Sequence, residues 1–297
     1  MSLDVTRVLA AEPLRTELVW EPRDVLLYHL GLGAGRRATS PAELPYVLES
    51  RLRVLPSFAT VAGGHMASMA ALSAPGVDVD LAAVLHAGQR LELHRPVPAS
   101  GRARLDTRVL EVHDKGRAAV LVVRSEATDR EGPLWTATAQ LYVRGEGGFG
   151  GERGTARRHV PPERDPDLVV DYPVAENQAL LYRLSGDLNP LHADPGFARL
   201  AGFPRPVLHG LCTYGMALRA VVDGLLDGDT ERVLSLDARF AGVVYPGETL
   251  RLRMWRGSGD LDAGSTRGEQ FSLTAEVVER AGELALTDGL VRCRPRD

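Results

Sequence analysis

The sequence predicts an α+β fold that occurs twice in one chain, each copy being an antiparallel sheet around a helix. Three observations predict it: a Gly- and Pro-rich join near the midpoint, an ordered repeat on either side of it, and a helix with few charges followed by alternating strands. The 297 residues, 44% of them hydrophobic, can form the core of one large domain or of two ordinary ones.

The join lies in residues 144–167, which read RGEGGFGGERGTARRHVPPERDPD. This stretch is dense in glycine, proline and charge and has little apolar periodicity, which is typical of a linker or a long surface loop. We therefore assign residues 1–148 to an N-terminal half, residues 149–168 to the linker and residues 169–297 to a C-terminal half.

Short matches between the two halves recur in the same order. They pair Leu26–Leu30 with Leu180–Leu184, Pro98–Gly101 with Tyr245–Gly247, and Leu141–Arg144 with Leu290–Cys293. One such match can arise by chance, whereas three in sequence at nearly constant offsets indicate a duplicated fold.

Each half has the same coarse order: a short helix, a longer helical stretch, then strands. In the second half Asn177–Leu184 is the short helix and Leu211–Leu226 the longer one. Few charges on the longer helix predict that it is buried on most sides. Period-2 alternation predicts strands at Ser235–Val244, Glu248–Trp255, Gln270–Arg280 and Leu284–Arg294.

Composition excludes several classes of function. The net charge of −4 gives no footprint for nucleic acid. No apolar stretch approaches the roughly 20 residues of a membrane span, and the N-terminus has no signal pattern. Two cysteines, Cys212 and Cys293, point to a reduced, cytoplasmic protein. With no C-x-x-C or H-E-x-x-H motif, no metal site is expected.

The segment 182–215 carries the candidate chemistry. Pro190 cannot continue a helix, so residues 186–192 form a loop that displays Asp187 and His192. Asp194 followed by Pro195 predicts the N-cap of a short helix that ends near Gly202.

Gly210 directly precedes the long helix of the second half. The first amides of a helix have no internal partner, and the helix dipole adds positive potential there. Without a side chain, Gly210 leaves its N–H open to an oxyanion. A carboxylate and an imidazole beside such a donor suit proton chemistry next to a carbonyl group.

These residues carry a specific resemblance. The run GDLNPLHADP, followed by PVLHG, resembles the signature of the MaoC-like family, which includes the (R)-specific type-2 enoyl-CoA hydratases. In the first half LHAGQRLELHRPVPASG, EVHDKGRAAV and VRGEGGFGG resemble the non-catalytic half of the two-part hydratases in peroxisomal multifunctional enzymes. The similarity covers most of residues 20–297.

The resemblance implies a double hotdog fold and hydration of a trans-2-enoyl-CoA to a (3R)-3-hydroxyacyl-CoA. It implies that Asp187 and His192 hold the attacking water, that Asn189 supports the substrate site, and that the Gly210 N–H binds the thioester oxygen. No cofactor is expected, since CoA is carried by the acyl-CoA substrate.

The resemblance also implies that the first half makes room for acyl chains. At an offset of 154, the residues aligned with Asp187, Asn189 and His192 are Gly33, Gly35 and Ala38, so this half lacks the dyad. The Gly- and Ala-rich stretch Phe58–Ala74 fits either a loosened central helix or a closely packed segment.

Alternatives stay open. The same site could dehydrate 3-hydroxyacyl groups on acyl carrier protein, or the chain could be a non-catalytic hotdog partner subunit. A homodimer is expected from the resemblance alone. We expect His209 to orient its turn, and we treat five further histidines as structural: His29, His65, His86, His94 and His113.

Overall fold

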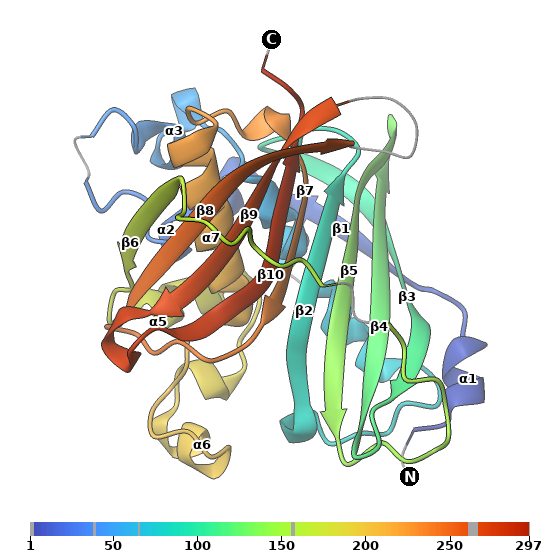
Figure 1. Ribbon diagram of the computed structural model, residues 1–297. Coiled ribbons are helices and arrows are strands. Elements are labelled where there is room, and N and C mark those ends of the chain that lie inside the picture. Colours follow the sequence, from blue (N-terminus) through green and yellow to red (C-terminus); the bar gives the residue numbers. More distant parts are fainter. Residues whose placement is uncertain (1–2, 38–39, 65, 156–157, 261–266, 297) are drawn as a thin grey trace.

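The computed structural model describes residues 3–37, 40–64, 66–155, 158–260 and 267–296. Within them the strands form one ten-stranded sheet in which every pairing is antiparallel. The strands are β1 Leu14–Trp20, β2 Val84–Leu93, β3 Gly101–Asp114, β4 Ala118–Asp129, β5 Gly132–Arg144, β6 Leu168–Pro173, β7 Val233–Phe240, β8 Thr249–Asp260, β9 Arg267–Val277 and β10 Glu283–Cys293 (Figure 1).

The strand order confirms the duplication. From edge to edge it is β1-β3-β4-β5-β2-β7-β10-β9-β8-β6. Read outward from the centre, the first half runs β2, β5, β4, β3, β1 and the second runs β7, β10, β9, β8, β6, which is the same order. The halves join where β2 pairs with β7, from Gly88 opposite Arg239 to Glu92 opposite Ser235.

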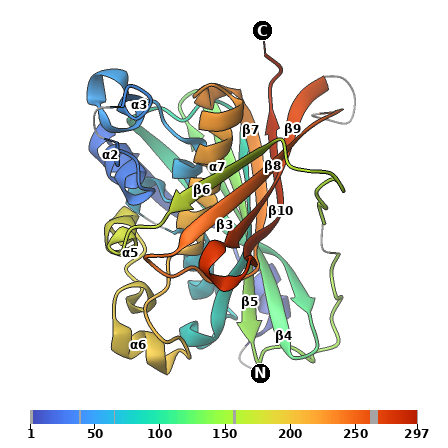
Figure 2. The ribbon, with the colours of Figure 1, turned by 60° about the vertical axis from the view of Figure 1, so that its left-hand side comes forward.

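The helices are α1 Val5–Leu9, α2 Pro22–Gly31, α3 Leu44–Val47, α4 Ala67–Ala70, α5 Gln178–Tyr182, α6 Pro195–Leu200 and α7 Gly210–Leu225. Figure 2 shows α7 between the sheet and the outer helices α2, α3 and α5. The predicted long helix is thus confirmed, and nearly all of its residues are buried. At Gly215 a Cβ would lie 2.6 Å from the Tyr28 hydroxyl, so glycine permits the close packing of α2 on α7.

The first-half counterpart of α7 is not a continuous helix. The chain there forms 3₁₀ turns at Pro56–Thr60, Ala62–Gly64 and Ala71–Ser73, with the single-turn α4 between them. Gly63 and Gly64 have φ values of 77° and 70°, in the left-handed region that breaks a right-handed helix. The expectation of a longer helix here is therefore wrong, while the expected loosening is confirmed.

The sequence reading missed the two edge strands, β1 and β6. In both strands exposed residues alternate with less exposed ones, but the strands are short and lie before the first pair of matching segments, Leu26–Leu30 and Leu180–Leu184. Residue 168, assigned to the linker, is already the first residue of β6. The strand predicted over Gln270–Arg280 ends at Val277, where a 3₁₀ turn and a left-handed Ala281 (φ 53°) reverse the chain.

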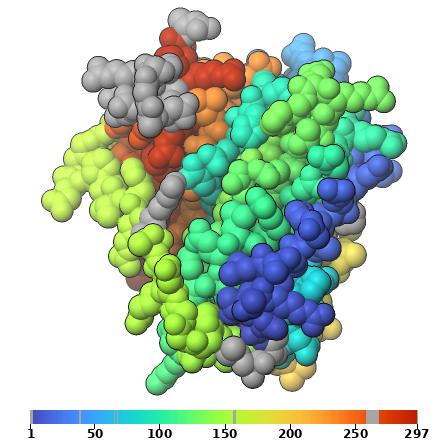
Figure 3. Space-filling model, turned by 90° about the vertical axis from the view of Figure 1, so that its right-hand side faces the viewer, coloured from blue at the N-terminus to red at the C-terminus, as the bar shows by residue number. Residues whose placement is uncertain are grey.

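The segment between β5 and β6 contains no helix or strand in its described part and runs over the outside of the molecule, yellow-green in Figure 3. Its start is fixed by Asp114, whose carboxylate accepts hydrogen bonds from the N–H groups of Gly116, Gly148 and Gly150. These bonds hold the pKa of Asp114 below its usual range. The domain boundaries at 148 and 169 stay a prediction.

No helix in the described residues is long and apolar enough to cross a membrane.

Buried His29 of α2 ties the outer layer together. Its Nδ1 donates to the Tyr46 carbonyl oxygen at 2.9 Å, and its Nε2 accepts from Leu55 N–H at 3.2 Å. A ring that donates at one nitrogen and accepts at the other is neutral. Burial lowers the pKa of His29 from 6.5 to about 4.

This burial predicts acid sensitivity. The unfolded chain takes up a proton at His29 near pH 6.5 and the folded chain only near pH 4, so stability falls as the pH falls between these values. The loss from His29 between pH 7 and pH 5 should be about 2 kcal/mol. Urea denaturation of wild type and His29→Gln at both pH values measures it. An equal pH dependence in the two proteins contradicts the assignment.

Candidate active site

The loop with Asp187 and His192 follows α5. After the 3₁₀ turn Arg183–Ser185 the chain bends at Gly186, whose φ is +126° and whose Cβ would lie 2.5 Å from the Gly64 backbone. The predicted loop 186–192 is confirmed, except that Pro190–His192 forms a 3₁₀ turn within it. The Asp194 carboxylate accepts from Gly196 and Phe197 N–H, so the predicted N-cap of α6 is confirmed.

Short polar contacts shape this loop. Asp187 Oδ1 accepts from Asn189 N–H at 3.1 Å, and Asn189 Oδ1 accepts from Leu191 N–H at 3.0 Å. Asn189 is exposed and caps the turn that carries His192. Its position therefore explains how the loop is built, while a contact between Asn189 and substrate stays a prediction.

The predicted dyad lies together. His192 Nδ1 lies 2.8 Å from the Val207 carbonyl oxygen, which can only accept, so neutral His192 carries its proton on Nδ1. The lone pair is then on Nε2, which lies 3.7 Å from Asp187 Oδ2. This separation is too long for a direct hydrogen bond and leaves room for one water to contact both groups.

His209 belongs to the same cluster, and its contact with His192 is not predicted by the sequence spacing. Its ring stacks on that of His192, with centroids 3.6 Å apart and planes at 25°. Its Nε2 lies 3.2 Å from the Asp187 carbonyl oxygen and 4.0 Å from Asp187 Oδ2. His209 thus supports both the imidazole and the loop, in keeping with the orienting role expected for it.

Both imidazoles are held neutral. Burial lowers the pKa of His192, although the Asp187 carboxylate opposes this shift. The pKa of His209 falls well below 6.5, first through burial and then through the neighbouring His192. A neutral imidazole with a free Nε2 lone pair can accept a proton from water at neutral pH.

Gly210 is the first residue of α7, one position later than predicted, since the sequence placed it directly before the helix. Among the described residues its N–H has no hydrogen-bond acceptor, as expected for the first residue of a helix. A Cβ at this position would lie 3.1 Å from two atoms of the Phe240 ring. Glycine therefore leaves the amide accessible in a place where a side chain would crowd Phe240.

Asp187, His192 and His209 are also the residues here that could hold a metal, since their candidate ligand atoms lie within 4.8 Å of one another. However, nearly parallel stacked imidazoles direct their in-plane lone pairs side by side, whereas a metal needs them to converge at about 2 Å. The arrangement favours a shared water, and the lack of a cofactor stays a prediction.

A small internal cavity extends from this end of α7 into the first half. It has a volume of about 20 Å³ and is lined by Leu211 of α7, Trp135 and Ala137 of β5, and Ala62 and Ser68 of the broken segment, among others. The volume is close to that of a single water. A ligand larger than a water molecule therefore cannot enter this cavity unless the residues that line it move.

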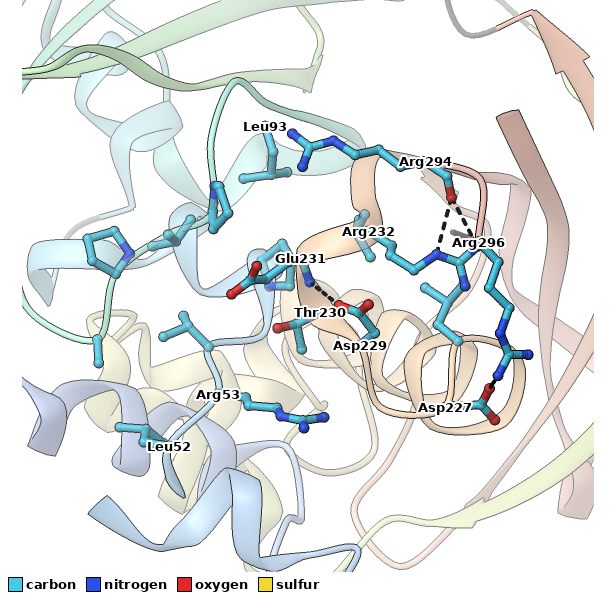
Figure 4. Close-up of a pocket in the computed structure, with 18 of the residues that line it drawn as sticks. Leu52, Arg53, Leu93, Asp227, Asp229, Thr230, Glu231, Arg232, Arg294 and Arg296 are labelled. Carbon is cyan, nitrogen blue, oxygen red and sulfur yellow. Dashed lines mark hydrogen bonds and ion pairs between the residues drawn. The ribbon is translucent and has the colours of Figure 1, made fainter. Parts of the chain in front are cut away.

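A second pocket, of about 910 Å³, lies at the opposite end of α7 beside Leu226 (Figure 4). The helix separates it from Gly210 by about 24 Å. Three arginines of this pocket already have partners within the protein. Arg296 forms an ion pair with Asp227 at 2.7 Å. Arg232 donates to the Arg294 carbonyl oxygen, and Arg53 donates to the Gly228 carbonyl oxygen. None of the predicted site residues lines it.

A doubled sheet around a buried helix, with a carboxylate and a neutral imidazole at the helix N-terminus, defines the hydratase and dehydratase class of hotdog proteins. Two families match in tandem: MFE-2 hydratase 2 N-terminal domain over residues 19–145 and MaoC like domain over residues 158–277. The chain belongs to this MaoC-like, hydratase-2 family.

Two relatives that are similar to most of this chain support the family assignment. The chain is 50% identical over 258 residues to the enoyl-CoA hydratase ChsH3 of Mycobacterium tuberculosis, covering 86% of this chain and 90% of the relative. It is 43% identical over 268 residues to the 3-hydroxyacyl-thioester dehydratase Y of the same organism, covering 86% and 88%.

Solved structures show the fold. A MaoC-like dehydratase from Phytophthora capsici superposes with a TM-score of 0.84 at 28% identity, over 99% of this chain and 98% of that one. A Mycobacterium tuberculosis protein described as a double hotdog fold gives a TM-score of 0.59 at 15% identity, covering 98% of both chains. The predicted double hotdog is therefore confirmed.

The pKa of His192 predicts the pH profile of the enzyme. If His192 is the neutral base, acidification protonates it and lowers activity, and its lowered pKa places this acid limb below pH 6.5. The profile of kcat/KM measures the midpoint. His192→Gln should lack this limb in its residual activity, and a wild-type midpoint above 6.5 contradicts the role.

Proposed function

We propose that the chain hydrates trans-2-enoyl-CoA thioesters to (3R)-3-hydroxyacyl-CoA thioesters. The observation that carries the proposal is the pair formed by Asp187 Oδ2 and His192 Nε2, 3.7 Å apart and next to the N-terminus of α7. The hydro-lyase class agrees with the enoyl-CoA hydratase and dehydratase names of the relatives.

The geometry suggests how the reaction proceeds. Water between the dyad donates one hydrogen bond to His192 Nε2 and one to Asp187 Oδ2. As its oxygen attacks C3, His192 takes the proton, and Asp187 stabilises the imidazolium. The Gly210 N–H stabilises the enolate-like thioester oxygen, and the dyad returns a proton to C2.

Among the described residues of the first half, the positions aligned with Asp187 and Asn189 carry no acid or amide. Gly33 and Gly35 occupy the positions aligned with Asp187 and Asn189, and both have φ near +80° in a turn after α2. We propose that this half accommodates the acyl chain, since the internal cavity beyond Leu211 lies between its sheet and its broken helix.

Dehydration of a 3-hydroxyacyl thioester on acyl carrier protein is the second candidate. One site catalyses both directions, and dehydratase Y is similar over most of this chain. Comparing kcat/KM for the CoA and carrier-protein thioesters of one acyl group separates the two. The third candidate, a non-catalytic partner subunit, conflicts with the intact dyad.

A homodimer and a cytoplasmic location stay predictions. Exposed leucines near the site are compatible with association, because Leu184, Leu188 and Leu200 are 54%, 61% and 89% exposed. Analytical ultracentrifugation at micromolar concentration tests the dimer, and a single monomeric species contradicts it.

The dyad variants test the proposed reaction. Asp187→Asn and His192→Gln should each lower hydration of crotonyl-CoA by about 10²- to 10⁴-fold, the usual contribution of a general acid or base. Loss of enoyl absorbance measures the rate, and chiral analysis of the product tests the (R) configuration. Asp194→Asn, at the cap of α6, is the matched control and should retain activity. Unchanged rates in both dyad variants would refute the mechanism.

A larger side chain in the internal cavity should lower kcat/KM more for long enoyl-CoA substrates than for short ones. Ala137→Leu adds volume on the inner face of β5 and should prevent the burial of two or three methylene groups, about 0.8 kcal/mol each, which corresponds to roughly a 15- to 60-fold loss of kcat/KM for a long enoyl-CoA. Crotonyl-CoA should be affected much less. Thr138→Leu, on the neighbouring residue and the other face of β5, is the control. Equal losses for C4 and C12 substrates from Ala137→Leu contradict the acyl path.

A further inference from the structure

His86 of β2, expected to be structural, lies next to the proposed site. Gln89 of β2 lines the internal cavity, and Leu91 and Leu93 are buried in the core, so alternate residues from 89 onward face inward. Regular alternation would direct His86 outward. The register shift between His86 and Gly88 inserts one extra residue and turns His86 to the inner face.

The neighbour of His86 connects it to Gly210. Its ring packs against that of Phe240 of β7 with centroids 4.9 Å apart, and Phe240 is the residue that a Cβ on Gly210 would contact at 3.1 Å. Because β2 and β7 pair at the centre of the sheet, a side chain of the first half reaches the N-terminus of the second-half helix.

The His86 ring has one nitrogen without a partner. Its Nε2 is buried and has no hydrogen-bond partner among the described residues. Burial lowers the pKa of His86 to about 4, while the Gly88 backbone and the Gln89 side chain raise it as hydrogen-bond acceptors do. The ring is therefore neutral, and a neutral ring that carries its proton on Nδ1 has a lone pair on Nε2. A buried acceptor without a donor costs stability unless a ligand supplies the donor.

Position along the strand indicates which part of the substrate meets His86. Gln89 lies deeper, at the cavity proposed for the acyl chain, whereas His86 lies nearer the start of β2, beside Phe240 and the thioester donor Gly210. Near its sulfur an acyl-CoA carries one hydrogen-bond donor, the amide N–H of the cysteamine unit.

We propose that His86 Nε2 accepts a hydrogen bond from the cysteamine amide of the substrate and so positions the thioester against Gly210. The first half would then contribute a polar contact to the reaction as well as space for the acyl chain. This inference rests on the proposed function and adds a substrate-positioning residue to it.

Three crotonyl thioesters test the contact: crotonyl-CoA, its N-acetylcysteamine analogue, which keeps the amide, and S-butyl thiocrotonate, which has none. His86→Phe should lower kcat/KM about tenfold for the first two, the equivalent of one hydrogen bond, and leave the third within about twofold. His86→Gln offers a carboxamide acceptor and should recover most of the loss. His94→Phe, on an exposed residue that follows the same strand, should change none of the three.

The outcomes separate this inference from the function itself. Turnover of crotonyl-CoA by wild type and its loss in Asp187→Asn test the function alone. An equal loss for all three thioesters in His86→Phe, or no loss for any, overturns the role of His86. If His86→Phe does not fold, the ¹⁵N resonance of His86 Nε2 in Asp187→Asn provides the test. It should shift on saturation with crotonyl-CoA, and an unmoved resonance overturns the proposal.

Discussion

The pairing of β2 with β7 is the constraint on which the rest of the structure depends. It joins two five-stranded halves into one sheet, and α7, which lies on the strands of the second half, is covered by α2 and by the 3₁₀ turn Pro56–Thr60 of the first half. A helix buried on nearly all sides cannot be stabilised by one half alone. The same pairing sets the N-terminus of α7 beside the first residues of β2. Burial of the helix and assembly of the site therefore follow from one interface.

The side chains of the candidate site are held in place by local contacts within one segment of the second half. Asn189 caps a single turn, Val207 fixes the tautomer of His192, and the Asp187 backbone receives His209. All of these contacts lie within the segment 187–209. The dyad can therefore be encoded in one continuous motif, while the groups that face it come from distant strands such as β2 and β7.

This division explains what the sequence could predict. The Asp187 loop, the N-cap at Asp194 and the start of α7 follow from proline, glycine and capping residues at fixed spacings, and the structure confirms them. The stacking of His209 on His192 depends on how residue 209 enters α7, for which spacing gives no signal. The inward position of His86 depends on a one-residue bulge that reverses the alternation of β2, and alternation alone gives the wrong face.

The two halves differ most where α7 has no intact counterpart. In the first half, Leu18, Leu105 and Trp135 line a small cavity against Ala62 and Ser68 of the broken segment. Short 3₁₀ turns joined by left-handed Gly63 and Gly64 have fewer internal hydrogen bonds than a helix, so displacing them costs less. Gly186, at the bend into the loop that carries Asp187, packs directly on the Gly64 backbone. If an acyl chain displaces the broken segment as proposed, this contact would transmit the displacement to the Asp187 loop, and the size of the acyl group would then affect the position of the dyad.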